Sequence, residues 1–135
     1  MADCCLSVVL ILGTLLITGC GEEPGRVRVR QDEVVGAYET NFDGGREVLE
    51  LRNDQTYVQD FIAGKKSIHH TGKWKIENHF LNGSDVVLIS AVVSENDKET
   101  APERTGDRIL NVHSSSGKLT LALNETADWY FVRKK

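Results

Sequence analysis

Apolar and polar residues alternate with a period of two along most of the chain beyond residue 33. This period is typical of β-strands, whose side chains point to two faces in turn, and no eleven-residue window sustains a helical apolar stripe. The clearest case is the run in which Leu119, Leu121 and Leu123 alternate with their neighbours. The pattern predicts eight strands, at residues 33–40, 47–52, 56–62, 72–78, 86–93, 108–113, 118–123 and 129–133.

The segments between these strands are mostly short and contain turn-forming residues. Asn53-Asp54-Gln55 predicts a tight turn, and Asn82-Gly83 is the strongest hairpin signal in the chain. Short turns make neighbouring strands antiparallel, and closing the sheet removes the two unpaired edges that an open sheet would expose. We therefore predict an all-β fold, a single up-and-down antiparallel barrel of about eight strands over residues 33–135.

The stretch from Val86 to Val93 departs from simple alternation, because it is apolar on both faces except at Ser90. We expect Val87, Ile89 and Ala91 to fill the barrel together with Ile109. Five apolar side chains would then point outward: Val86, Leu88, Val92, Leu110 and Val112. An exposed patch of this kind is usually covered, here by the long polar loop 94–106, by a second copy or by a partner.

The first twenty residues carry a different signal. The apolar run from Leu6 to Ile17 is shorter than the roughly 20 residues of a membrane-spanning helix and fits the hydrophobic region of a signal peptide. It ends in Ile17-Thr18-Gly19-Cys20, which resembles the lipobox of bacterial lipoproteins. The resemblance implies cleavage before Cys20 and attachment of lipid to its thiol, which makes residues 1–19 a signal peptide. The alternative is a buried apolar strand or helix.

The lipobox resemblance has consequences for cysteine chemistry and for location. Cys4 and Cys5 would leave with the signal peptide and Cys20 would carry lipid, so no thiol remains for a disulfide or for catalysis. The resemblance places the protein in the cell envelope, anchored to a membrane through Cys20. Gly21 in the next position favours the outer over the inner membrane.

Residues 20–32 have the composition of a tether between lipid and domain, with glycine, proline and many charges. Three arginines, Arg26, Arg28 and Arg30, alternate with valines in this segment. They can contact anionic head groups, keep a linker solvated, or belong to an irregular first strand.

Composition bounds the size and the partners. The 135 residues suit one domain, and a net charge of −4 from 16 basic and 20 acidic side chains excludes the basic excess of a nucleic-acid-binding protein.

Candidate chemistry is sparse. The four histidines, His69, His70, His79 and His113, lack metal-site spacing, and His69 and His70 are expected in a loop. The nucleophile motif Gly-x-Ser-x-Gly is absent. We predict no catalytic residue, no metal and no cofactor.

The turn from Ser114 to Gly117 faintly resembles the inhibitory loop of periplasmic lysozyme inhibitors, although the basic residue and tyrosine that follow in that family are missing here.

Gly36-Ala37-Tyr38 resembles the Gly-x-Trp signature of calycins, the superfamily of lipocalins and avidins, with tyrosine replacing tryptophan. In that family an arginine of the last strand packs across the aromatic ring, and Arg133 stands in the matching place. The implied role of Gly36, Tyr38 and Arg133 is structural. Further motifs give the chain a similarity to small lipocalin-like bacterial proteins of unassigned function: Leu49-Glu50-Leu51, Asp54-x-Thr56-Tyr57, Gly72-x-Trp74 and Trp129-Tyr130-Phe131.

Two main functions remain open, with enzyme inhibition as a third. In the first, the barrel is filled by its own side chains and its outer surface is an interaction scaffold for envelope proteins. In the second, the barrel binds a small apolar or amphipathic ligand, and five residues line the site: Tyr57, Phe61, Trp74, Leu121 and Trp129. A cavity of roughly 300 Å³ or more favours ligand binding, and a packed interior favours the scaffold.

Overall fold

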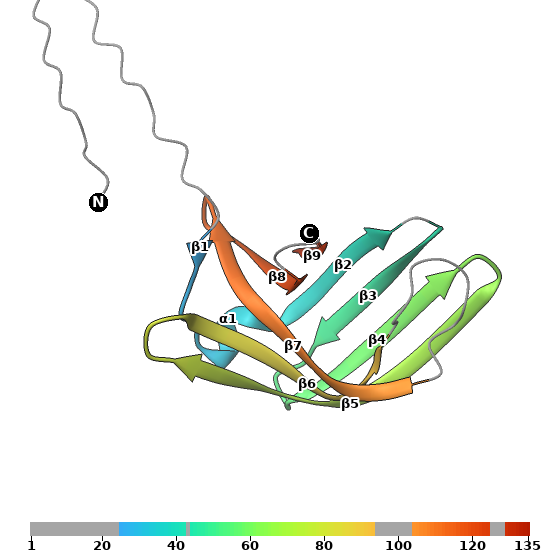
Figure 1. Cartoon of the computed structure of the whole chain (residues 1–135), viewed down its shortest axis with the longest axis horizontal. Coiled ribbons are helices and arrows are strands. Elements are labelled where there is room, and N and C mark those ends of the chain that lie inside the picture. Colours follow the sequence, from blue (N-terminus) through green and yellow to red (C-terminus); the bar gives the residue numbers. More distant parts are fainter. Residues whose placement is uncertain (1–24, 43, 94–103, 125–128) are drawn as a thin grey trace, which may run out of the picture.

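The computed structural model describes residues 25–42, 44–93, 104–124 and 129–135, which form one antiparallel sheet and one short helix (Figure 1). The elements follow in the order β1 (Gly25–Arg26), α1 (Gln31–Val34), β2 (Gly36–Phe42), β3 (Gly45–Leu51), β4 (Thr56–Ala63), β5 (Lys66–His79), β6 (Gly83–Val93), β7 (Arg104–Ser115), β8 (Lys118–Asn124) and β9 (Trp129–Arg133).

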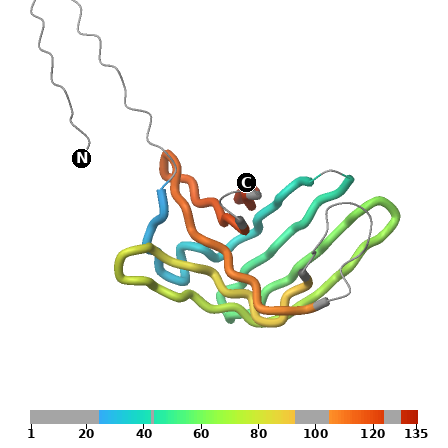
Figure 2. Tube along the Cα trace, viewed as in Figure 1, coloured from blue at the N-terminus to red at the C-terminus, as the bar shows by residue number. Residues whose placement is uncertain are grey.

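The sheet closes on itself. Each strand from β2 to β8 pairs with the next along the chain, and β9 pairs with both β8 and β2. Figure 2 shows the trace passing around this ring from one hairpin to the next. The prediction of an all-β, eight-stranded, up-and-down antiparallel barrel is therefore confirmed, with β1 as an extra strand on β7.

Two elements differ from the expected boundaries. β5 is 14 residues long, because residues 66–70, which were expected to be irregular, pair one by one with β4. The last pair joins Lys66 to Ala63. His69 and His70 therefore lie in a strand, and the prediction of a loop there is wrong. The four-residue helix α1 was not predicted, since one helical turn is too short to show a period. Glu33 caps this helix by accepting a hydrogen bond of 2.6 Å from the Arg30 backbone nitrogen.

Residues 25–30, which we call the strap, lie along the barrel. Gly25 and Arg26 form the irregular first strand that was one of the alternatives for the arginine-rich segment, and they pair with Ser114 and His113 of β7. Val29 is 8% exposed and belongs to the hydrophobic core. The tether composition therefore does not keep these residues away from the domain.

The inward faces of the strands and the end of α1 form one hydrophobic core. Its largest fully buried side chains are Trp74, Tyr38, Tyr57 and Phe131. Val34 of α1 is completely buried and packs into the same cluster. The helix thus contributes to the core at the end of the barrel where β2 begins.

The expected apolar patch on β6 and β7 is absent. Ala91 is buried in the core as expected, but most of the other residues were assigned to the wrong face. Val86, Leu88, Leu110 and Val112 are completely buried in the core, and Val92 is also buried. Ile89 and Ile109, expected inside, are instead 39% and 53% exposed.

A β-bulge explains why a single alternation does not run through β6. The register between β6 and β7 shifts between Leu88 and Ala91, and Ser90 has a positive φ of 53°. The extra residue changes the phase of the alternation, so Ala91 points inward together with Leu88 rather than with Ile89. The loop proposed to cover the patch lies largely outside the described residues.

Candidate functional site

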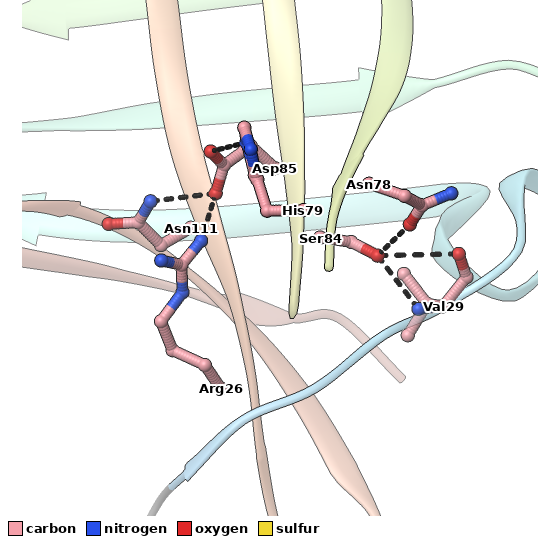
Figure 3. Close-up of polar contacts among 7 residues, drawn as sticks. All are labelled: Arg26, Val29, Asn78, His79, Ser84, Asp85 and Asn111. Atoms are coloured by element: carbon pink, nitrogen blue, oxygen red, sulfur yellow. Dashed lines mark hydrogen bonds and ion pairs between the residues drawn. The ribbon is translucent and has the colours of Figure 1, made fainter. Parts of the chain in front are cut away.

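The strap is clamped to the turn end of the β5–β6 hairpin by a buried carboxylate, that of Asp85 (Figure 3). Asp85 is the third residue of β6. Its carboxylate accepts a hydrogen bond from Arg26 and one of 2.8 Å from the Asn111 side-chain nitrogen. Its second oxygen lies 2.9 Å from His79 Nε2. One carboxylate therefore joins the strap, β5, β6 and β7.

Ser84 forms the second half of this clamp. Its Oγ accepts a hydrogen bond of 2.9 Å from the Val29 backbone nitrogen and contacts the Asn78 side-chain oxygen (Figure 3). The Ser84 backbone nitrogen donates to the Val27 oxygen at 2.9 Å. A Cβ added at Gly83 would lie 2.8 Å from that same Val27 oxygen, so the strap and the hairpin are in direct contact.

A second polar cluster lies inside the barrel. Arg108 of β7 forms a two-pronged ion pair with Glu47 of β3, at 2.5 and 3.2 Å, and both side chains are almost completely buried. Gln59 of β4 donates to Glu47 at 2.6 Å and also bonds both backbone groups of Val92. Most polar groups of this cluster are hydrogen-bonded to one another. Arg108 Nε has no hydrogen-bond partner among the described residues.

The three residues of the calycin resemblance come together where the ring closes. The Arg133 guanidinium lies 5.3 Å from the centre of the Tyr38 ring and donates to the Tyr38 hydroxyl at 2.9 Å. It also donates to the backbone oxygens of Glu33 and Val35 at the end of α1. Gly36 has a φ of +149°, and an added Cβ would lie 3.4 Å from Arg133. These contacts tie the last strand to the helix and to β2.

Four of the five candidate ligand-binding residues point into the core. Tyr57 and Leu121 are completely buried, Trp74 is 1% exposed and Phe61 is 5% exposed. Their polar atoms are also used, since the Tyr57 hydroxyl donates to the Ile89 oxygen at 3.0 Å and Trp74 Nε1 donates to the Arg52 oxygen at 3.0 Å. The fifth residue, Trp129, lies in β9, but its side chain lies outside the description.

The histidines are distributed over separate contacts. His69 Nδ1 lies 2.6 Å from Asp60 Oδ1, and His70 Nε2 lies 2.8 Å from the Ser90 backbone oxygen. His79 contacts Asp85, as described above. The His113 ring packs edge-on against Tyr130. Within the ranges that the structure describes, no three histidine, cysteine, aspartate or glutamate side chains are grouped so that they could hold a metal ion.

Burial changes the acidity of two tyrosines. It raises the pKa of Tyr57 to about 12, with a smaller opposing effect from the charge of Arg108. Burial also raises the pKa of Tyr38, while the charge and hydrogen bond of Arg133 oppose the rise. Both hydroxyls therefore stay protonated in the folded protein at pH values where a solvated tyrosine ionises.

We expect the folded state to lose stability as the pH rises from 10 to 12. In the unfolded chain Tyr57 releases its proton near pH 10, so the folded protein binds more protons in this window and the free energy of unfolding falls with pH. One such proton gives a slope of up to about 1.4 kcal/mol per pH unit. Urea unfolding across this range checks the effect, and Tyr57→Phe should flatten the slope. If Tyr57→Phe showed the same dependence of unfolding free energy on pH as the wild type, the assignment of this effect to Tyr57 would be contradicted.

No family model, curated protein or solved structure matches the chain. In the described part of the chain, no helix combines the length and the apolar content needed to cross a bilayer. Cys20, the predicted lipidation site, lies outside the described residues.

Several residues of the two polar clusters were not found from the sequence. Glu47 lies in phase with Leu49 and Leu51, and Arg108 lies in phase with Leu110 and Val112. A charged residue on the inward face of a strand is the signal that could have revealed the interior ion pair. Asp85 and Ser84 carry no comparable signal, because the strap that they bind lies more than fifty residues away in sequence.

Proposed function

We propose that this protein is a non-enzymatic, lipid-anchored protein of the bacterial cell envelope whose barrel acts through its outer surface as an interaction scaffold. The lipobox at Cys20 supports the anchor, and its following glycine favours the outer membrane. The scaffold role is supported mainly by one observation, the nearly complete burial of the side chains inside the barrel.

A hollow large enough for a small ligand would leave accessible surface on the side chains that line it. Tyr57, Trp74 and Leu121 have almost none. The charged groups inside the barrel, Glu47 and Arg108, are paired with each other at hydrogen-bond distance. Both the apolar and the charged inward residues therefore have partners in the chain itself, which favours the outer surface as the part that meets other molecules.

Metabolic labelling with radioactive palmitate tests the anchor. The full chain expressed in a bacterial host should take up the label and sediment with membranes. Cys20→Ala should lose both properties, because the thiol that receives the lipid is gone. Cys5→Ala is the matched control, since it removes a cysteine of the signal peptide and should keep the label. An unlabelled wild-type protein would refute the anchor.

Native mass spectrometry of the protein purified from its own host tests the scaffold against ligand binding. We expect the mass of the acylated polypeptide with no retained small molecule. A stoichiometric additional mass that survives purification would show a ligand and would overturn the scaffold proposal while leaving the anchor intact.

A further inference from the structure

The tip of the β5–β6 hairpin presents the two most exposed large apolar side chains in the described structure. Phe80 is 93% exposed and Leu81 is 86% exposed, while the other exposed large apolar residues do not exceed 57%. The tip consists of residues 80–82, between His79 and Gly83. Two adjacent side chains of this size in water indicate a surface that meets something apolar.

The tip lies at the end of the barrel where the chain enters it. In an up-and-down barrel successive turns alternate between the two ends, so the β5–β6 and β7–β8 turns share one end and the β4–β5 turn lies at the other. Gly25 pairs with Ser114 beside the β7–β8 turn, and Val27 contacts Gly83 beneath the tip. Figure 1 shows β1 and the β5–β6 hairpin on the same side of the barrel.

The clamp fixes this arrangement. The Asp85 bond with Arg26 and the Ser84 bonds with Val27 and Val29 hold the strap against the turn end of the hairpin. Because the Asp85 carboxylate is paired with Arg26, it does not present an uncompensated negative charge beneath the tip. Exposed charged side chains of both signs lie at the same end, among them Arg28, Lys118, Asp32 and Asp54.

The distance to the lipidation site is short. Cys20 precedes Gly25 by five residues, a length of chain that spans at most about 18 Å. An acyl chain on Cys20 therefore keeps this end of the barrel close to the bilayer surface.

From these observations we propose that Phe80 and Leu81 insert into the bilayer beside the lipid anchor and orient the barrel with its strap end toward the membrane. This inference rests on the acylation of Cys20 proposed above. The contact is between these apolar side chains and the upper part of the acyl chains.

Site-specific fluorescence tests the contact in the acylated full-length protein. Leu81→Cys provides a thiol for an environment-sensitive nitrobenzoxadiazole label, since the thiol of Cys20 is blocked by lipid. The protein is reconstituted into vesicles of equal parts phosphatidylcholine and phosphatidylglycerol, with or without spin-labelled acyl chains. We expect a blue-shifted emission that the spin-labelled lipid quenches.

Lys65→Cys is the matched control, because Lys65 is also exposed in a hairpin turn but lies at the opposite end of the barrel. Its label should remain unquenched. Phe80→Cys provides a second position at the tip and should behave as Leu81→Cys does. Because both tip side chains are exposed, neither variant should shift the urea midpoint.

The outcomes separate this inference from the proposed function. If the vesicles carry the protein but the label at position 81 is not quenched, the anchor stands and the tip contact is refuted. A blue shift that grows with protein concentration without lipid quenching would indicate a second copy at the tip and would also refute it. Protein that lacks acyl chains and fails to float with the vesicles would refute the proposed anchor itself.

Discussion

Replacing Arg108 by alanine is expected to lower the free energy of unfolding by about 3–5 kcal/mol, because a buried charge loses its partner. Arg108 neutralises Glu47 through two contacts, and only 2% of the Glu47 side chain is exposed. Without the guanidinium, the carboxylate must remain charged in the core or take up a proton. Urea unfolding at neutral pH measures the loss as a lower midpoint.

The double variant Glu47→Met with Arg108→Met is the control for this prediction. It removes both charges at similar volume, and it also removes the Arg108 Nε that has no hydrogen-bond partner among the described residues. We expect it to recover most of the stability lost in the single variant. If the double variant were as unstable as Arg108→Ala, lost packing against Phe131 would explain the effect better than the unpaired charge.

Trp74→Ala is expected to cost about 3–5 kcal/mol of unfolding free energy, as for other large aromatic side chains removed from a packed core. Trp74 is the largest fully buried side chain, and its indole nitrogen donates to the Arg52 oxygen. Its backbone nitrogen also bonds the Gln55 oxygen, so this position joins β5 to the turn between β3 and β4.

Trp74→Phe separates the two contributions of the side chain. Phenylalanine keeps most of the apolar contact but loses the indole hydrogen bond and part of the ring volume, so we expect a smaller cost, about 1–3 kcal/mol. Chemical unfolding of both variants gives the comparison. A Trp74→Ala variant as stable as the wild type would mean that Trp74 lines a hollow, and it would revive ligand binding inside the barrel.

The barrel was predictable because one face of most strands is apolar and the other polar. Leu119, Leu121 and Leu123 show this alternation directly, and short turns such as Asn82-Gly83 determine the antiparallel pairing. On β6 and β7 most residues were assigned to the wrong face, because these strands are apolar on both faces and the alternation does not show which face points inward. A change of backbone phase adds to the difficulty on β6. The bulge at Ser90 causes this change, and a period of two contains no information about an inserted residue.

The sites were less predictable for a physical reason. Gly36, Tyr38 and Arg133 were found through the calycin resemblance. That family shows which residues of the first and last strands meet when the ring closes. Glu47 and Arg108 lie on strands that are not neighbours in the sheet, so no local pattern pairs them. The strap was expected to be a tether because of its charged composition, with an irregular first strand as one alternative, whereas its valines and backbone groups have partners on the barrel.

The closure between β2 and β9 has a consequence for how the protein folds. Each hairpin can form from residues close together in sequence, but the contact of Arg133 with Tyr38 joins residues 95 positions apart. Bringing such distant segments together costs chain entropy before the contacts between them form and stabilise the barrel. We therefore expect closure to limit the folding rate. Until then β2 and β9 remain open edges, and the chain is most prone to aggregate during that interval.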